Sequence, residues 1–302
     1  MTRAKKIIAL VFVSLLMLSL LCGCGASQTA DAPAEATTEI DYSSMVADQS
    51  EMIEEDTVVL AGMTPIEGKS LKDGTYPIKV TTSSTMFPVT DCELTVQDGK
   101  MTAVMTMSGT GYLYVYMGTG LEAAKADEKD YIPFGENSEG KHTFTVPVES
   151  LNSALDCAAF SKKKGKWYNR KICFRADSLP DEAFAEGVLH TAQSLGIKDG
   201  DYTCDLILGG GTGRAEVASP ANVRIKDGKC TLEVAWSSPN YDYMLVDGEK
   251  YELANTEGNS VFEIPVKYFD IPVTVIGDTT AMSQPYEIEY TITLDSSSLK
   301  EK

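Results

Sequence analysis

Alternating apolar and polar residues recur along the chain from its first third to its C-terminus. YPIKV at 76–80 and YEIEYTITL at 286–294 are two examples. A period of two predicts strands that bury one face and expose the other. Turn signals separate these stretches, among them QDGK at 97–100 and KDGK at 226–229, and Asp-Gly pairs are typical of tight hairpins. The pattern therefore predicts an all-β chain built as antiparallel β-sandwiches.

An internal repeat divides this all-β chain. LKDGTYPIKV at 71–80 matches IKDGDYTCDL at 197–206, and later segments match in the same order. Self-similarity of this kind indicates that one structural unit occurs twice. We therefore expect two tandem sandwiches, over 69–178 and 196–298, joined by a linker over 179–195.

Several aromatic positions correspond between the repeats. Two tyrosines of each repeat align without a gap, Tyr112 with Tyr241 and Tyr114 with Tyr243. Counting on from the matched TFTVPV and VFEIPV segments, Tyr168 falls opposite Tyr286 and Ile172 falls opposite Tyr290. The repeats are thus predicted to share the first tyrosine of YEIEY and to differ at the second.

Two segments depart from the strand pattern. DEAFAEGVLHTAQSLG at 181–196 has helix-like spacing, and it predicts a helix in the linker. GTGLEAAKADEKDYIPF at 118–134 is an insertion in the first repeat, and it predicts a short surface helix.

The N-terminus predicts an exported protein that a lipid anchors. Residues 1–23 join a basic start to an apolar run, Ile7–Leu21, which is typical of a signal peptide and short for a membrane span. The run ends in LCGC, which resembles a bacterial lipobox and implies a lipid on Cys24. Cys22 is the alternative acceptor, and a plain secretory signal is the alternative interpretation.

The segment that follows the lipobox predicts a spacer. Residues 24–68 are rich in Ala, Ser, Thr and acids, a composition that predicts a flexible, acidic tether. We therefore expect the protein at the extracellular face of the cell membrane, in contact with the membrane only through its lipid.

The net charge and the lack of common catalytic motifs argue against two classes of function. The formal net charge of -18 argues against nucleic acid as a partner. His142 and His190 are the two histidines, and neither G-x-S-x-G nor H-E-x-x-H occurs, so we do not expect an enzyme.

Five cysteines follow Cys24, and an odd number excludes complete pairing. Buried free thiols are the simplest interpretation. The alternatives are disulfides within each repeat, Cys157–Cys173 and Cys204–Cys230.

The second repeat resembles a near-iron-transporter (NEAT) domain. The ordered segments that carry the resemblance are SPANVRIKDGKCTLEV at 219–234, SSPNYDYMLVDG at 237–248, VFEIPV at 261–266 and YEIEYTITL at 286–294. The resemblance covers nearly all of 196–297. It implies an immunoglobulin-like sandwich on the surface of a Gram-positive bacterium. It also implies that the protein captures haem and passes it to an ABC-type haem transporter or to another surface haem carrier.

The resemblance gives the two tyrosines of YEIEY a role. Tyr286 would ligate the haem iron, because Fe(III) favours a phenolate, as in tyrosine-ligated haem. Tyr290 would donate a hydrogen bond to the phenolate oxygen or stack on the porphyrin. Residues four apart on a strand share a face at roughly 13 Å, so both phenols are expected to face one groove. The alternative is that both tyrosines pack a sandwich face.

The resemblance implies further haem contacts in the second repeat. Arg214 lies in GGGTGRAEVAS at 209–219, the lip position, where its planar fork would suit a propionate; a flexible loop is the alternative. Tyr241, Tyr243 and Met244 would line the pocket floor, unless they belong to the core. Met282 would reach the other face of the iron or fill a gap.

The first repeat offers a second possible site. Its hairpin SKKKGKWYNRK at 161–171 carries six basic residues. Tyr168 is the candidate ligand there, with Trp167, Lys166 and the lip residue Met86 as helpers. For the basic hairpin itself, a solvated turn is the simplest interpretation. The alternatives are a clamp for an anionic ligand such as haem propionates and a docking patch for an acidic partner. A different function for the whole chain is a tandem immunoglobulin-like adhesion or carbohydrate-binding module.

Overall fold

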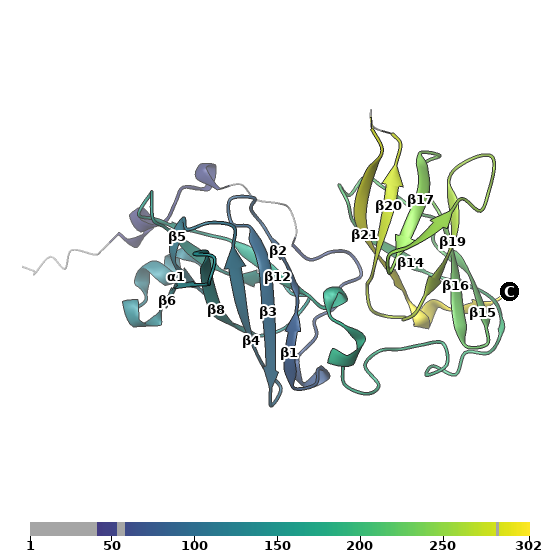
Figure 1. The fold of residues 1–302 in the computed structure, drawn as a ribbon, viewed down its shortest axis with the longest axis horizontal. Helices are drawn as coiled ribbons and strands as arrows, with labels where there is room; N and C mark the ends of the chain where they lie inside the picture. Colours follow the sequence, from purple (N-terminus) through teal and green to yellow (C-terminus); the bar gives the residue numbers. More distant parts are fainter. Residues whose placement is uncertain (1–40, 53–57, 282–283) are drawn as a thin grey trace, which may run out of the picture. The chain divides into compact units, whose positions relative to one another are not determined.

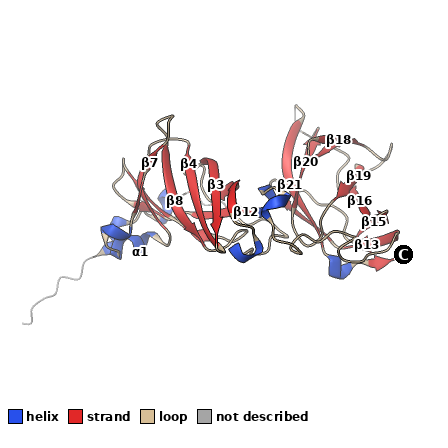
Figure 2. Ribbon diagram, turned by 60° about the horizontal axis from the view of Figure 1, so that its bottom comes forward, coloured by secondary structure: helices blue, strands red, loops and turns tan. Residues whose placement is uncertain are grey.

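The computed structural model describes residues 41–52, 58–281 and 284–302. The predicted signal peptide, the lipidation residue Cys24 and the candidate haem contact Met282 lie outside these residues. In the described part the chain is all-β, as the sequence pattern predicts, with antiparallel strands throughout and little helix (Figures 1 and 2).

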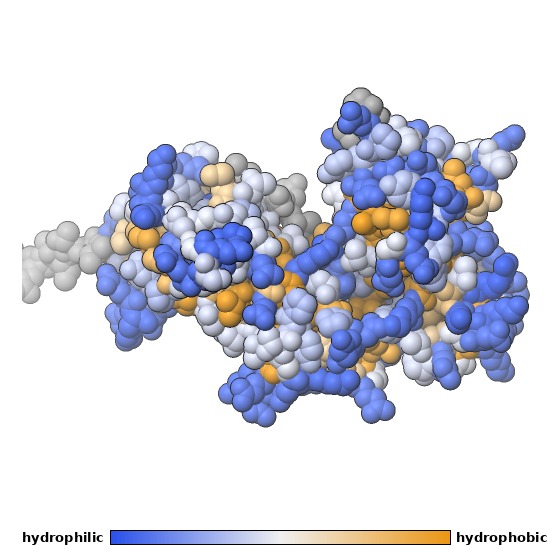
Figure 3. Space-filling model, viewed as in Figure 1, coloured by the Kyte–Doolittle hydropathy of each residue, from blue (hydrophilic) through white to orange (hydrophobic). Residues whose placement is uncertain are grey.

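We call residues 58–178 the first β-region and residues 200–302 the second β-region. Residues 41–302 form one compact unit that holds both regions. Polar side chains cover most of the face in Figure 3, with smaller apolar areas between them.

The first β-region contains three antiparallel sheets. The five-stranded sheet has the order β1 (Gly74–Pro77), β3 (Val89–Gln97), β4 (Lys100–Met107), β8 (His142–Val148), β7 (Gly135–Glu136). The four-stranded sheet has the order β11 (Trp167–Tyr168), β10 (Ala158–Ser161), β5 (Tyr112–Tyr116), β6 (Ile132–Pro133). The three-stranded sheet has the order β2 (Lys79–Thr82), β12 (Lys171–Arg175), β9 (Leu155–Asp156).

The second β-region contains two five-stranded sheets. One has the order β19 (Val261–Val266), β16 (Lys229–Ala235), β15 (Ala221–Lys226), β13 (Gly200–Cys204), β22 (Lys300–Glu301). The other has the order β14 (Leu206–Gly210), β21 (Tyr286–Leu294), β20 (Val273–Thr279), β17 (Tyr241–Val246), β18 (Glu249–Glu252).

Each region has its own hydrophobic core. In the second region one buried cluster takes alternate residues from both sheets, such as Leu232 and Ile264 from one and Val275 and Ile292 from the other. Because both sheets contribute to one cluster, they pack face to face as a sandwich. The first region buries a separate cluster around Leu94, Phe144 and other strand residues. Five buried cysteines remain free thiols, as the simplest interpretation predicts: Cys92, Cys157, Cys173, Cys204 and Cys230.

The strand registers correct the predicted alignment of the repeats. Val115 pairs with Ala159 in the first region, and Met244 pairs with Gly277 in the second. Ala159 pairs with Tyr168, nine positions later, whereas Gly277 pairs with Ile288, eleven positions later. The closing hairpin of the second region is therefore two residues longer.

This longer hairpin changes which residues correspond. Tyr168 corresponds to Ile288, and Arg170 corresponds to Tyr290. The predicted match of Tyr168 with Tyr286 was wrong, because an ungapped count does not allow for the insertion in a turn. Tyr286 has Lys166 as its counterpart.

The predicted linker helix is also wrong. Within 181–196 the structure has a short 3-10 turn, Asp181–Ala183, and further turns. Gly187 adopts a φ of +79°, which a helix does not accommodate. Instead Phe184 forms a β-bridge with Leu71 and is buried. Burial of single apolar side chains on neighbouring strands outweighed the helical spacing.

The predicted tether over 24–68 does not extend to its C-terminal end. The backbone N–H of Ala47 donates to the carbonyl of Trp167 at 2.8 Å. Ile66 bridges Leu151 and belongs to the first core. Scattered apolar residues are enough to hold these segments, because strands with free edges are available to them.

The predicted short helix in the first repeat is confirmed as α1 (Gly120–Lys125). Thr119 and Glu122 form a capping box at its start, which satisfies N–H groups that have no partner inside the helix. Ala123 and Ala124 are buried against Trp167. The helix therefore covers part of the first region.

Candidate functional site

The two tyrosines of YEIEY have different environments. Both lie on β21, side by side with β20 (Figure 1), where Tyr286 pairs with Thr279 and Tyr290 pairs with Val275. Tyr290 is 2% exposed and belongs to the core, whereas Tyr286 is 59% exposed. The predicted common groove for both phenols is therefore wrong, because the core encloses the second tyrosine.

Tyr290 is part of a buried aromatic cluster. Its hydroxyl lies 2.9 Å from the hydroxyl of Tyr241. Trp236 stacks on Tyr241 with ring centroids 3.9 Å apart and packs on Tyr290 at 5.1 Å. Burial, and the bond to Tyr241, raise the pKa of Tyr290. A buried phenol that keeps its proton is unsuited to ligate iron, so Tyr290 has a packing role.

The lip closes directly over this cluster. Gly211 has a φ of +59°, and a Cβ on it would lie 2.5 Å from the Tyr290 ring. Only glycine allows the backbone this close to the ring. Arg214, farther along the lip, is exposed. Gly211, directly after β14, thus serves the packing of Tyr290.

A β-bulge separates the candidates on β17. Tyr241 pairs with Thr279, but Tyr243 pairs with Asp278, so Asp242 is the extra residue. The bulge sends Tyr241 and Met244 into the core and Tyr243 to the opposite face of the sheet. The prediction that Tyr243 lines the same floor as Tyr241 is therefore wrong, since spacing alone does not reveal a bulge.

On that outer face Tyr243 lies among charged side chains. Its hydroxyl donates to Glu287 at 2.9 Å, and the ammonium of Lys250 lies 4.3 Å from its ring centroid. The bond to Glu287 raises the pKa of Tyr243 to about 12. The neighbouring Asp278 is buried, and burial together with the nearby carboxylate of Asp242 raises its pKa. This face of the sheet is acidic.

Tyr286 is left as the accessible phenol of the candidate site. It is the most exposed tyrosine in the described part of the chain, and its hydroxyl has no hydrogen-bond partner among the described residues. Thr279 and Tyr241 continue the same row across the sheet. The exposed ring therefore lies at the first residue of β21, in a row whose other two members are buried.

The second possible site, in the first region, is mostly buried. Trp167 packs between Tyr131 and Phe160, with ring centroids 4.9 Å and 5.2 Å away. Tyr168 is buried and donates to the carboxylate of Glu51 at 3.3 Å. Burial, with the charge of Glu51, raises the pKa of Tyr168. Neither ring is available to a ligand in this arrangement.

The other two candidates of that site stay at the surface. Met86 is 63% exposed on the lip, and its carbonyl accepts from the Tyr112 hydroxyl at 3.0 Å. The carbonyl of Lys166 accepts from the Ser161 N–H at 2.9 Å, which closes the basic hairpin. The structure therefore separates these two residues from the buried rings.

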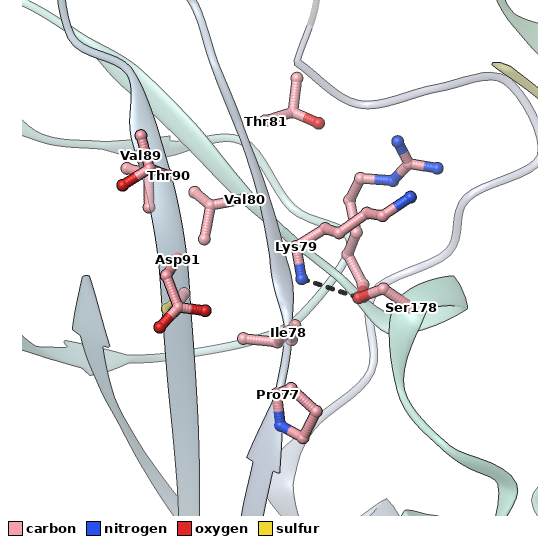
Figure 4. Close-up of a pocket in the computed structure, with 11 residues that line it drawn as sticks. Pro77, Ile78, Lys79, Val80, Thr81, Val89, Thr90, Asp91 and Ser178 are labelled. Atoms are coloured by element: carbon pink, nitrogen blue, oxygen red, sulfur yellow. Dashed lines mark hydrogen bonds between the residues drawn. The ribbon is translucent and has the colours of Figure 1, made fainter. Parts of the chain in front are cut away.

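A hollow of about 420 Å³ lies where the chain passes from β1 to β2, beside the start of β3 (Figure 4). Its wall includes Lys79, whose N–H donates to the Ser178 hydroxyl at 2.8 Å. Lys79 and Arg175 both bind the carboxylate of Glu289, at 2.7 Å and 2.6 Å. Since a carboxylate already occupies both cations, this hollow is not an open site for an anion.

Sequence reasoning missed three residues that organise these sites. Trp236 ends the alternation CTLEVAW, so its burial was readable from the pattern. Arg175 sits in KICFR, where a buried arginine contradicts the apolar pattern. Arg170 is one of the six basic residues of the hairpin at 161–171. No sequence signal marks it as buried.

No known protein family matches the chain, and no curated protein matches it. Among the described residues, no group of three or more His, Cys, Asp or Glu side chains is arranged to hold a metal ion. No helix in the described ranges has the length and apolar character needed to cross a membrane.

Proposed function

We propose that the chain is a lipid-anchored extracellular binding protein that captures haem through Tyr286. In this proposal both β-regions are immunoglobulin-like sandwiches, and the second one is a NEAT-like domain. The captured haem passes to a transporter or to another surface carrier.

One observation carries the proposal. Tyr286 presents an exposed phenol without a hydrogen-bond partner in the described residues, at the end of a rigid nine-residue strand. An iron ligand must be accessible and free to lose its proton, and Tyr286 meets the first of these needs where Tyr290 and Tyr241 do not. The aromatic cluster of Trp236, Tyr241 and Tyr290 supports the strand from inside. Tyr290 therefore acts as a packing residue behind the ligand.

A haemin titration of residues 41–302, followed by absorbance, tests the proposal. We expect a saturable Soret band with a charge-transfer band of tyrosinate-bound iron. Tyr286→Phe removes the ligand oxygen and should abolish the charge-transfer band. Tyr290→Phe, a matched change four residues along the same strand, should keep it. Equal spectra for the wild type and Tyr286→Phe, or no saturable binding by the wild type, would reject haem ligation.

The burial of Tyr290 favours one other function. With the second phenol enclosed in the core, Tyr286 is the exposed phenol of the pair, and an exposed aromatic ring is also a surface on which a sugar ring stacks. An adhesion or carbohydrate-binding module is therefore the second candidate. Binding of an immobilised polysaccharide that Tyr286→Ala abolishes, without haemin binding, would support it.

A further inference from the structure

Arg170 is a buried cation that has no counterion among the described residues. Its side chain is 4% exposed, and no carboxylate of the described residues lies within 4.0 Å of its guanidinium. Arg175, five residues along the chain, is also buried but binds both Asp177 and Glu289. Buried charges in proteins are normally paired because leaving water is costly. Arg170 is therefore an exception, and an anion that binds its guanidinium would remove the cost of burying the charge.

The hydrogen bonds of Arg170 leave one edge of its guanidinium open. Nη1 donates to the carbonyl of Asn169 at 2.9 Å. Nε is buried and has no partner, and Nη2 makes no hydrogen bond to a described residue. Nε and Nη2 form one edge of the planar fork, which is the geometry that binds two oxygens of a carboxylate or phosphate.

Neighbouring groups do not neutralise this charge. The Tyr168 ring lies 5.1 Å from the guanidinium carbon, a cation-π contact without charge transfer to the cation. Cys157 is fully buried, and burial raises the pKa of its thiol to about 12 against the opposing effect of Arg170. The thiol is therefore neutral at pH 7. Glu51, which accepts from Tyr168, pairs with Lys164 instead.

The place of Arg170 in the fold is also unusual. The closing strand of the first region is interrupted between β11 and β12, and Asn169 and Arg170 occupy the interruption. In the second region the corresponding strand, β21, runs without a break through Tyr290. The carbonyl of Arg170 still accepts from the Cys157 N–H at 2.8 Å. This bond holds the backbone of Arg170 in place. The regular strand pairing is nevertheless interrupted at this residue, whose side chain lacks a partner in the described residues.

Basic side chains gather around the interruption, where Glu51 and Asp156 pair with two of them, Lys164 and Lys171. Lys162, Lys163 and Lys166 belong to the same hairpin, and none of them has an ion pair within 4.0 Å in the described part of the chain. On a protein of net charge -18, such a local cluster attracts anions from solution. Arg170 itself is nearly enclosed, so only a small oxyanion group can reach its open edge.

We propose that Arg170 anchors an oxyanion site of the first β-region, which takes a carboxylate or phosphate group of a small ligand at the interruption between β11 and β12. The anion binds the Nε–Nη2 edge of the guanidinium in a bidentate manner, and the hairpin lysines draw it in. The site is independent of haem binding at Tyr286, which lies in the other region.

Inorganic phosphate and citrate are the probes for this site. Thermal unfolding and calorimetric titration of residues 41–302 would be followed at constant ionic strength, with chloride as the balancing ion. We expect the melting temperature of the wild type to rise with phosphate, with citrate or with both, in a saturable manner, since a ligand that binds only the folded state stabilises it. The more effective probe identifies the natural oxyanion.

Variants at Arg170 decide the assignment. Arg170→Met should lose the response and weaken the affinity at least tenfold, whereas Arg224→Met, at an exposed arginine paired with Asp201, should respond as the wild type does. Arg170→Lys keeps the charge without the fork, and it should bind more weakly than the wild type even if Arg170→Met fails to fold. A wild type indifferent to both probes, or an unchanged response in Arg170→Lys and Arg170→Met, would overturn the proposal.

Discussion

The two β-regions close with corresponding strands but fill one position differently. In the second region β21 is continuous, and Tyr290 points into the core and bonds Tyr241 at 2.9 Å. In the first region the strand breaks, and Arg170 occupies the corresponding position without a carboxylate partner among the described residues. The same backbone plan thus encloses a satisfied phenol in one region and an unsatisfied cation in the other.

This difference shows which residues hold each region together and which are available to a ligand. A buried group whose hydrogen bonds are complete contributes to stability, as Tyr290 and Arg175 do. A buried group with an open donor, such as Arg170, and an exposed group without a partner, such as Tyr286, contribute little to the fold. Ligand sites are therefore expected at the second kind of residue in both regions.

The largest expected effect separates the two buried arginines. Arg175→Met leaves the buried carboxylate of Asp177 without its partner, and we expect a loss of about 3–5 kcal/mol in the free energy of unfolding. Arg170→Met, which removes an unpaired cation, should leave that free energy unchanged or raise it. Urea unfolding measures both, with Arg224→Met as the exposed control. Equal losses for Arg170→Met and Arg175→Met would show that Arg170 is paired after all.

A smaller effect distinguishes the two tyrosines of β21. Tyr290→Phe removes the hydroxyl that Tyr241 contacts in the core, and the unsatisfied Tyr241 hydroxyl should cost about 1–3 kcal/mol. Tyr286→Phe, at an exposed position, should change the free energy of unfolding by less than about 0.5 kcal/mol. Denaturant midpoints of the two variants report the difference. A larger loss of the free energy of unfolding in Tyr286→Phe than in Tyr290→Phe would contradict this prediction.

The acidic outer face of the second region predicts a shifted phenol. Tyr243 has a pKa of about 12 because it donates to Glu287. Glu287→Ala should lower that pKa toward its ordinary value of about 10, as ultraviolet difference titration of the phenolate would show, with Tyr243→Phe to assign the step. An unchanged titration in Glu287→Ala would mean that Glu287 is not the cause.

The raised pKa of Tyr243 also determines how the stability of the fold changes at alkaline pH. The folded state keeps the Tyr243 proton up to a pH of about 12, whereas the unfolded chain loses it near pH ~10. The contribution of Tyr243 to stability is therefore complete below about pH 10 and is lost as the pH rises from there toward 12. In Tyr243→Phe this part of the alkaline loss should be absent.

The smallest effect concerns the second cation on Glu289. Lys79 binds Glu289 from a half-exposed position, whereas Arg175 binds it from a buried one. Lys79→Met should therefore cost at most about 1 kcal/mol, and the cost should shrink as salt is added. A salt-independent loss as large as that of Arg175→Met would place Lys79 among the buried contacts.

Much of the fold could be predicted from the sequence, because period-two alternation and Asp-Gly turns are local signals. The strand YEIEYTITL and the helix at 120–125 appear within the segments that predicted them. The helix expected over 181–196 does not form, and Phe184 instead bridges Leu71 and is buried in the first core. Local spacing does not report such a contact.

The candidate site was less predictable than the fold. The sequence alone determined that Tyr286 and Tyr290 share a strand and a face. Only the tertiary structure decided that one is exposed and the other enclosed, because Trp236 and the backbone at Gly211 pack against Tyr290. The bulge at Asp242 and the longer second hairpin likewise come from pairing with distant strands. The open edge of Arg170 follows for the same reason: a charge is unpaired only relative to the side chains that folding brings near it.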